Sequence, residues 1–82
     1  MRTLFVANLG KQITEDQVRL AFETHGEVDS VQIAHDPASG VSRGVAFVKM
    51  FDPKLASVMA KSMTGTVIEG RSIRVSLLSR TN

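Results

Sequence analysis

An aromatic side chain lies between basic ones at alternate positions near the middle of the chain. Arg43, Phe47 and Lys49 have the same parity, so in an extended strand their side chains point to one face. Such a face can bind single-stranded nucleic acid, because every base offers a π-face for stacking and every phosphate attracts a cation. Duplex nucleic acid is a poorer match, since its bases are already stacked on each other. These residue types therefore indicate binding chemistry in which no covalent bond changes.

The strands that must position this face follow from the apolar pattern. Alternating or β-branched stretches predict four main strands and a short extended piece at 67–68, which leads into a Glu69-Gly70 turn. A cluster of turn residues from Asp36 to Gly40 separates the second strand from the third. The four main strands are expected over residues 3–7, 28–34, 43–51 and 71–76.

Cap signals and helical spacing predict two helices. Thr14 and Gln17 form a capping box at the start of the first helix, and Gly26 is expected to end it in a left-handed conformation. Asp52 at the N-cap and Pro53 at the first helical position start the second helix. Its buried stripe is expected to consist of Ala56, Met59, Ala60 and Met63.

The order β-α-β-β-α-β predicts an α+β fold, a ferredoxin-like βαββαβ sandwich. It has a four-stranded antiparallel sheet with two helices on one face, which leaves the other face open to water. If Leu4 and Val6 point toward the helices, Phe5 emerges beside Phe47, and parity places Val45 between the two rings. The residues expected to form a binding site on the open face are Phe5, Phe47, Arg43, Val45, Lys49, Arg74, Gln32 and Ser76.

Two segments resemble the signature motifs of the RNA recognition motif family. Residues 43–50 are similar to its octapeptide, and residues 4–9 are similar to its hexapeptide on the first strand. The resemblance covers residues 3–76 and extends to small bacterial RNA-binding proteins with a single such domain. It implies that Phe5 and Phe47 each stack a base and that Arg43 binds phosphate. Val45 departs from the family pattern, which has an aromatic residue there that packs on a sugar.

Other kinds of chemistry find no support in the residues. The absence of cysteine excludes thiol catalysis, cysteine-type zinc sites and the cysteine pair of a metallochaperone. His25 and His35 are not at metal-binding spacing. An acylphosphatase on the same topology would need an arginine and a glycine-rich nest after the first strand, and residues 8–11 supply neither. We therefore expect no enzyme activity, no cofactor, no metal and no small-molecule substrate.

The 82 residues are expected to form one domain, with a core over residues 3–76 and a tail over residues 77–82. The chain lacks a signal segment and a long apolar run, so we expect a cytoplasmic monomer without a membrane partner, with a nuclear location left open for a eukaryotic protein. The expected partner is single-stranded RNA, with single-stranded DNA left open as a second ligand.

A protein-interaction module on the same fold is the alternative function. The missing aromatic at Val45 slightly favours it, whereas Phe5, Phe47 and Arg43 argue against it. Leu77 and Leu78 leave three arrangements open: packing on the sheet edge, covering part of the open face, or pairing with another chain.

Overall fold

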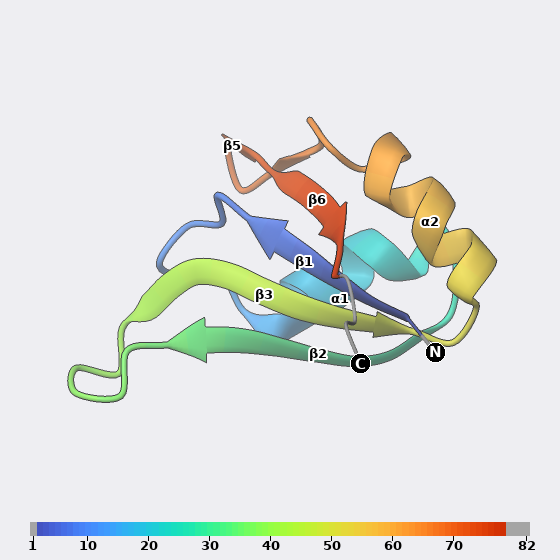
Figure 1. The fold of residues 1–82 in the computed structure, drawn as a ribbon. Coiled ribbons are helices and arrows are strands. Elements are labelled where there is room, and N and C mark those ends of the chain that lie inside the picture. Colours follow the sequence, from blue (N-terminus) through green and yellow to red (C-terminus); the bar gives the residue numbers. More distant parts are fainter. Residues whose placement is uncertain (1, 79–82) are drawn as a thin grey trace.

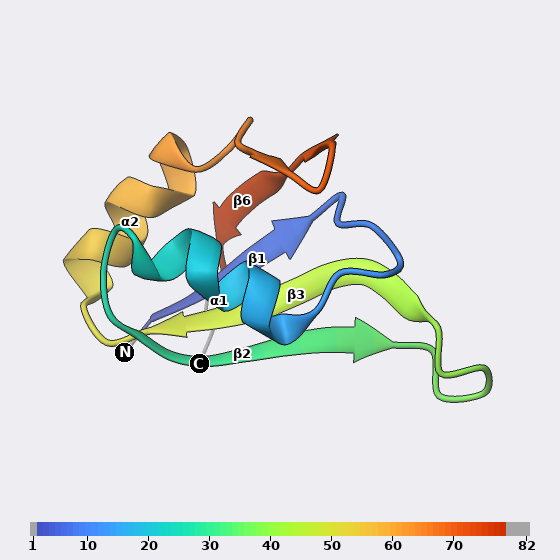
Figure 2. The same ribbon diagram turned by 180° about the vertical axis from the view of Figure 1, so that it is seen from behind.

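A four-stranded antiparallel sheet covered on one face by two helices makes up the computed structural model, which describes residues 2–78 (Figure 1). The strand order is β2-β3-β1-β6, and a separate two-stranded ladder joins β4 to β5. The predicted βαββαβ sandwich is confirmed, and Figure 2 shows both helices in front of the sheet on its covered face. The elements are β1 (Arg2–Ala7), α1 (Glu15–Glu23), β2 (Val28–His35), β3 (Ser42–Met50), α2 (Pro53–Ser62), β4 (Val67–Ile68), β5 (Arg71–Ser72) and β6 (Arg74–Leu77).

Both helices begin at the predicted caps. Thr14 Oγ1 accepts a hydrogen bond from the Gln17 amide at 3.2 Å, and Gln17 Oε1 accepts one from the Thr14 amide at 2.9 Å. Asp52 Oδ1 caps α2 by accepting hydrogen bonds from the amides of Lys54 at 2.9 Å and Leu55 at 3.3 Å. Such caps satisfy amides that the helix itself leaves unpaired, and each contributes about 1 kcal/mol.

Gly26 does not end α1 in the predicted left-handed conformation. The C-cap of α1 is Thr24 in the right-handed region, and Gly26 is not among the residues with positive φ. A Cβ atom at Gly26 would instead overlap the Leu55 Cδ2 atom of α2. The physical reason for glycine here is the close approach of the α1–β2 connection to α2, which a local sequence pattern does not encode.

The predicted last strand is divided at Ile73. Its first part, β5, pairs with β4, whereas its second part, β6, pairs with β1. Between them, the Ile73 amide donates to the Thr66 carbonyl at 2.9 Å, and the Ile73 carbonyl accepts from the Gly65 amide at 2.8 Å. Ile73 is almost fully buried, so the chain leaves one ladder for the other where this side chain enters the core.

The core lies between the sheet and the helices, and it contains the residues whose parity predicted inward orientation. Phe22 is its one fully buried ring among residues 2–78, and Met50 is fully buried as well. Leu77 packs against the core, and the Leu78 amide donates to the Thr3 carbonyl at 2.9 Å, so β1 continues to be paired beyond β6. The rest of the expected tail, residues 79–82, lies outside the described residues.

Within residues 2–78, neither helix has the length and apolar character needed to cross a membrane.

Candidate nucleic-acid interface

Two aromatic rings lie side by side at the centre of the open sheet face. Phe5 on β1 and Phe47 on β3 are direct cross-strand partners, and their ring centroids are 5.6 Å apart. Both rings are half-buried, whereas Leu4 and Val6 on the opposite face of β1 are fully buried. The predicted orientation of Phe5 beside Phe47 is therefore confirmed.

Polar side chains flank the ring pair on both sides. The strand register places Gln32 of β2 opposite Phe47 and Ser76 of β6 opposite Phe5. Because cross-strand partners share a face of the sheet, Gln32, Phe47, Phe5 and Ser76 form one row across all four strands. The row offers two apolar surfaces between two hydrogen-bonding groups.

Cations surround this row and have no carboxylate partner among the residues that the structure describes. Lys49 lies opposite Thr3, Arg74 lies opposite Ala7, and Arg43 extends from the start of β3; all three cations are exposed. The one ion pair among residues 2–78 joins Arg19 to Glu23 within α1, at 3.1 Å. The charges on the open face are therefore available to an anionic ligand.

Strand parity predicted that Val45 lies between the two rings, and this prediction is wrong. Phe5 and Phe47 face each other directly, and Val45 is two positions along β3 from Phe47. The physical reason is the register: antiparallel pairing brings one residue of each strand opposite one residue of the next, which leaves no place between two paired rings. Val45 is half-buried and borders a cavity beyond the ring pair.

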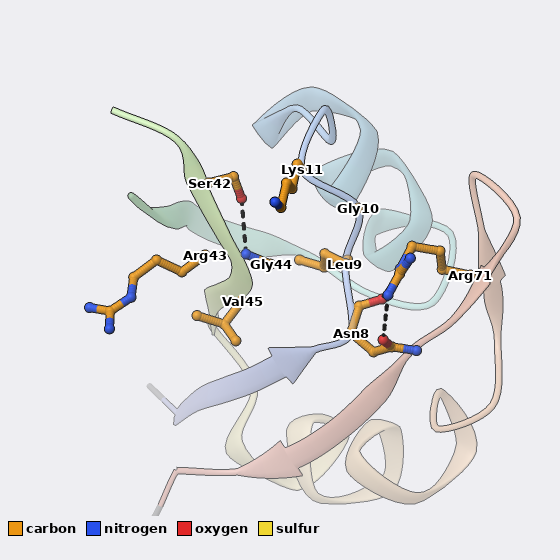
Figure 3. A pocket seen from close by; sticks show the side chains of 9 residues that line it. All are labelled: Asn8, Leu9, Gly10, Lys11, Ser42, Arg43, Gly44, Val45 and Arg71. Carbon is orange, nitrogen blue, oxygen red and sulfur yellow. Dashed lines mark hydrogen bonds between the residues drawn. The ribbon is translucent and has the colours of Figure 1, made fainter. Parts of the chain in front are cut away.

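This cavity has a volume of about 380 Å³ and lies between the β1–α1 connection, the start of β3 and Arg71 (Figure 3). We call it the loop cavity. Two of its cations, Lys11 and Arg71, were not predicted as site residues. The residues that line it are Asn8, Leu9, Gly10, Lys11, Ser42, Arg43, Gly44, Val45 and Arg71.

A bulge in β3 forms one wall of the loop cavity. Gly44 has a φ of 76°, and the β2–β3 register shifts between Ile33 and His35. The Leu9 amide donates to the Gly44 carbonyl at 2.9 Å, while a Cβ atom on Gly44 would lie 2.8 Å from the Leu9 carbonyl oxygen. Glycine is therefore required twice here, by its positive φ and by the crossing backbone.

Arg71 is fixed against the opposite wall by Asn8. Its Nε donates to the Asn8 carbonyl at 3.1 Å, and its Nη2 donates to Asn8 Oδ1 at 2.9 Å (Figure 3). Asn8 in turn donates from Nδ2 to the Ser72 carbonyl at 2.7 Å. Asn8 has a φ of 67°, a left-handed conformation that asparagine tolerates better than most residues. An asparagine directly after a strand was the one sequence signal for this arrangement.

The chain belongs to the RNA recognition motif family, because the model of that family matches residues 4–74. The resemblance seen in the two strand motifs is thereby confirmed.

Relatives and solved structures agree with this assignment. A poly(U)-binding splicing factor of Caenorhabditis elegans is 33% identical over 75 residues, which are 92% of this chain and 10% of that protein. The second domain of the yeast poly(U)-binding protein superposes with a TM-score of 0.88 at 27% identity, covering 100% of this chain and 99% of that one. A complex of the Sxl-lethal protein with RNA gives a TM-score of 0.82 at 31% identity, covering 93% of this chain and 47% of that one. The chain spans about a third or less of the length of the curated relatives that it matches.

Proposed function

We propose that this chain binds single-stranded RNA across the open face of its sheet and performs no catalysis. The observation that carries the proposal is the paired rings of Phe5 and Phe47, which lie at the sheet centre among cations that have no carboxylate partner within residues 2–78. Ring faces of this kind stack on bases, and each stacked base contributes about 1–3 kcal/mol.

The neighbouring residues supply the remaining contacts in this proposal. Arg43, Lys49 and Arg74 bind phosphates, because their exposed cations surround the ring pair. Gln32 and Ser76 are placed at the two ends of the ring row, where their polar groups can hydrogen-bond to base edges. RNA bases that are splayed out of a helix are read in this way on their exposed edges.

The comparisons support the choice of RNA and suggest the first sequence to test. Two of the similar proteins carry poly(U) binding in their names, and one solved structure is a complex with RNA. A short oligouridylate is therefore the first ligand to use. The matching single-stranded DNA tests whether the 2′-hydroxyl matters, since that group is what distinguishes RNA from DNA at a given site.

A protein-interaction module is the second candidate, and Val45 is the observation that favours it. Valine offers less surface than an aromatic residue and has no π-face, so the open face is a weaker platform for nucleic acid than the family pattern provides. A peptide ligand would rely on apolar contact and would respond little to salt, whereas RNA binding would weaken as salt rises.

Amide chemical shifts recorded during a titration with oligouridylate test the proposal. Shifts are expected at β1 and β3 around Phe5 and Phe47, with little change in α1 and α2, which cover the opposite face (Figure 2). A titration that leaves every amide unchanged, or that shifts the helices alone, would contradict RNA binding on the open face.

A further inference from the structure

We infer that the loop cavity holds a further nucleotide of the same RNA strand, with its phosphate contacted by Lys11 and Arg71. This inference rests on the proposed function and extends it from the open face to the edge of the sheet. It assigns a ligand to the two cations that lie outside the predicted site.

The position of the cavity follows the direction of β3. Val45 is two residues from Phe47 along that strand, a separation of about 6.6 Å, and it borders the cavity. An RNA strand that leaves the stacked pair along β3 therefore crosses Val45 and then reaches the cavity. Leu9 and Val45 give the cavity an apolar surface against which a sugar or base can pack.

The size of the cavity suits a nucleotide better than a bare ion. Its volume of about 380 Å³ falls in the range of about 300–1,000 Å³ that is usual for small-molecule sites.

The charge of the lining residues points to a phosphate. Three cations line the cavity, and no acidic residue is among its lining residues. In Figure 3 the Arg43 side chain extends away from the cavity on the side opposite Lys11 and Arg71. Arg43 therefore serves the open face, and Lys11 and Arg71 serve the cavity. Glu69 shares an adjoining hollow with Lys11 but forms no ion pair with it.

Asn8 holds the Arg71 side chain in place without neutralising its charge. Both of its hydrogen bonds go to neutral oxygens of Asn8, and they use Nε and Nη2, so Nη1 makes no hydrogen bond within residues 2–78. A guanidinium fixed in this way has already lost much of its side-chain freedom before a ligand arrives. Arginine binds phosphate through charge-assisted hydrogen bonds, which are stronger than neutral ones.

The test compares Lys11→Gln with wild type and with Lys54→Gln, using oligouridylates of increasing length and several salt concentrations. Lys11 is exposed and makes no side-chain hydrogen bond within residues 2–78, so its replacement should leave the fold intact. Lys54 is an exposed lysine on α2, away from the sheet's open face, and serves as the matched control. Arg71→Lys is the second variant, because it keeps the charge while changing the geometry that Asn8 imposes.

Strands long enough to extend past the ring pair should lose affinity with Lys11→Gln. The slope of log K against log salt should become shallower by about 0.7, the value for one phosphate contact on a single strand. The shortest strands that bind, and the Lys54→Gln control, should match wild type. Arg71→Lys should weaken the binding of long strands selectively as well, and long strands should shift the amides of Gly10 and Gly44 in the wild type.

Failure of this inference is distinguishable from failure of the proposed function. If wild type binds no RNA, or binds it without any effect of Phe47→Ala, the proposed function is wrong and the inference falls with it. If Phe47→Ala weakens binding but Lys11→Gln keeps the wild-type affinity and salt slope at every length, the open face binds RNA and the loop cavity does not.

Discussion

Phe5 and Phe47 are direct cross-strand partners whose ring planes are inclined by 57° to each other. The two rings are therefore neither stacked nor coplanar, and each presents its own surface at the top of the sheet. A ligand with two flat rings on a flexible backbone can follow this inclination, which a rigid duplex cannot.

Loss of either ring should reduce RNA affinity more than stability. Phe47→Ala and Phe5→Ala are each expected to lower the free energy of binding by about 1–3 kcal/mol, since one stacked base is lost. The control is Phe22→Ala in the core, where truncation of a fully buried ring should cost about 3–5 kcal/mol of unfolding free energy. Oligouridylate titrations and thermal melts of the three variants measure both quantities. Unfolding by Phe47→Ala as severe as by Phe22→Ala would mean that Phe47 acts as a core residue.

Salt dependence should increase with the length of the RNA. Strands that reach only Arg43, Lys49 and Arg74 should give a slope of log K against log salt of about −2, at about −0.7 for each contact. Strands that also place one phosphate against Lys11 and Arg71 should give about −2.8, since one further phosphate is neutralised. Fluorescence anisotropy of labelled oligouridylates at several salt concentrations measures the slopes. A slope near zero for all lengths would favour a protein partner over RNA.

Val45→Phe is expected to raise the affinity for short strands by about 0.5–1 kcal/mol, because it adds apolar contact area on the open face. Val45 is half-buried but outside the core, so the overpacking cost of an enlarged core residue should not apply. The same ring would take up part of the loop cavity, which Val45 lines, so long strands should gain less than short ones. Calorimetric titration of both lengths measures the difference. Equal gains for both would argue that RNA does not pass from Val45 into the cavity.

Gly44→Ala should destabilise the protein more than Gly40→Ala. Their φ values are nearly equal, 76° and 75°, so both sites require an alanine to adopt the same positive φ. A Cβ on Gly40 meets open space, whereas one on Gly44 lies 2.8 Å from the Leu9 carbonyl oxygen. We expect about 1 kcal/mol at Gly40, and about 2–3 kcal/mol at Gly44, in urea unfolding. Equal losses would show that the β1–α1 connection moves aside freely.

Gly26→Ala should destabilise the protein by about 1–3 kcal/mol, because its Cβ overlaps Leu55 Cδ2. The loss should be smaller when Leu55 is already alanine. A double-mutant cycle of the two substitutions by urea unfolding measures this coupling. Additive losses would indicate that glycine at position 26 serves a backbone conformation instead of the contact with α2.

Local patterns predicted the elements, the caps and the faces of the strands, because these depend on residues near one another in the chain. The capping box of Thr14 and Gln17 and the outward orientation of Phe5 are examples. Features set by distant segments were missed or misread. Glycine is required at position 26 because Leu55 packs against it, and cross-strand register pairs Phe5 with Phe47 so that Val45 is not between the rings.

The loop cavity was missed for the same reason. Arg71 and Asn8 are 63 positions apart in the sequence. The bulge at Gly44 is likewise bound to a distant segment, because the Leu9 amide donates a hydrogen bond to the Gly44 carbonyl. Asn8 directly after the strand was the one sequence signal for this loop, and nothing in the local sequence connects it to Arg71.

β1 lies inside the sheet, between β3 and β6, so the strands are expected to pair in a definite order during folding. β2 and β3 form a local hairpin, whereas β1 meets β3 across α1 and β2 and meets β6 only when residues up to Leu77 are present. Pairing over such separations is slow compared with hairpin closure, since more chain entropy is lost before contacts form. We therefore expect the ring of Phe47 to be in place on its hairpin before Phe5 arrives. During synthesis, the surface proposed to bind RNA should be complete only after β6 has left the ribosome.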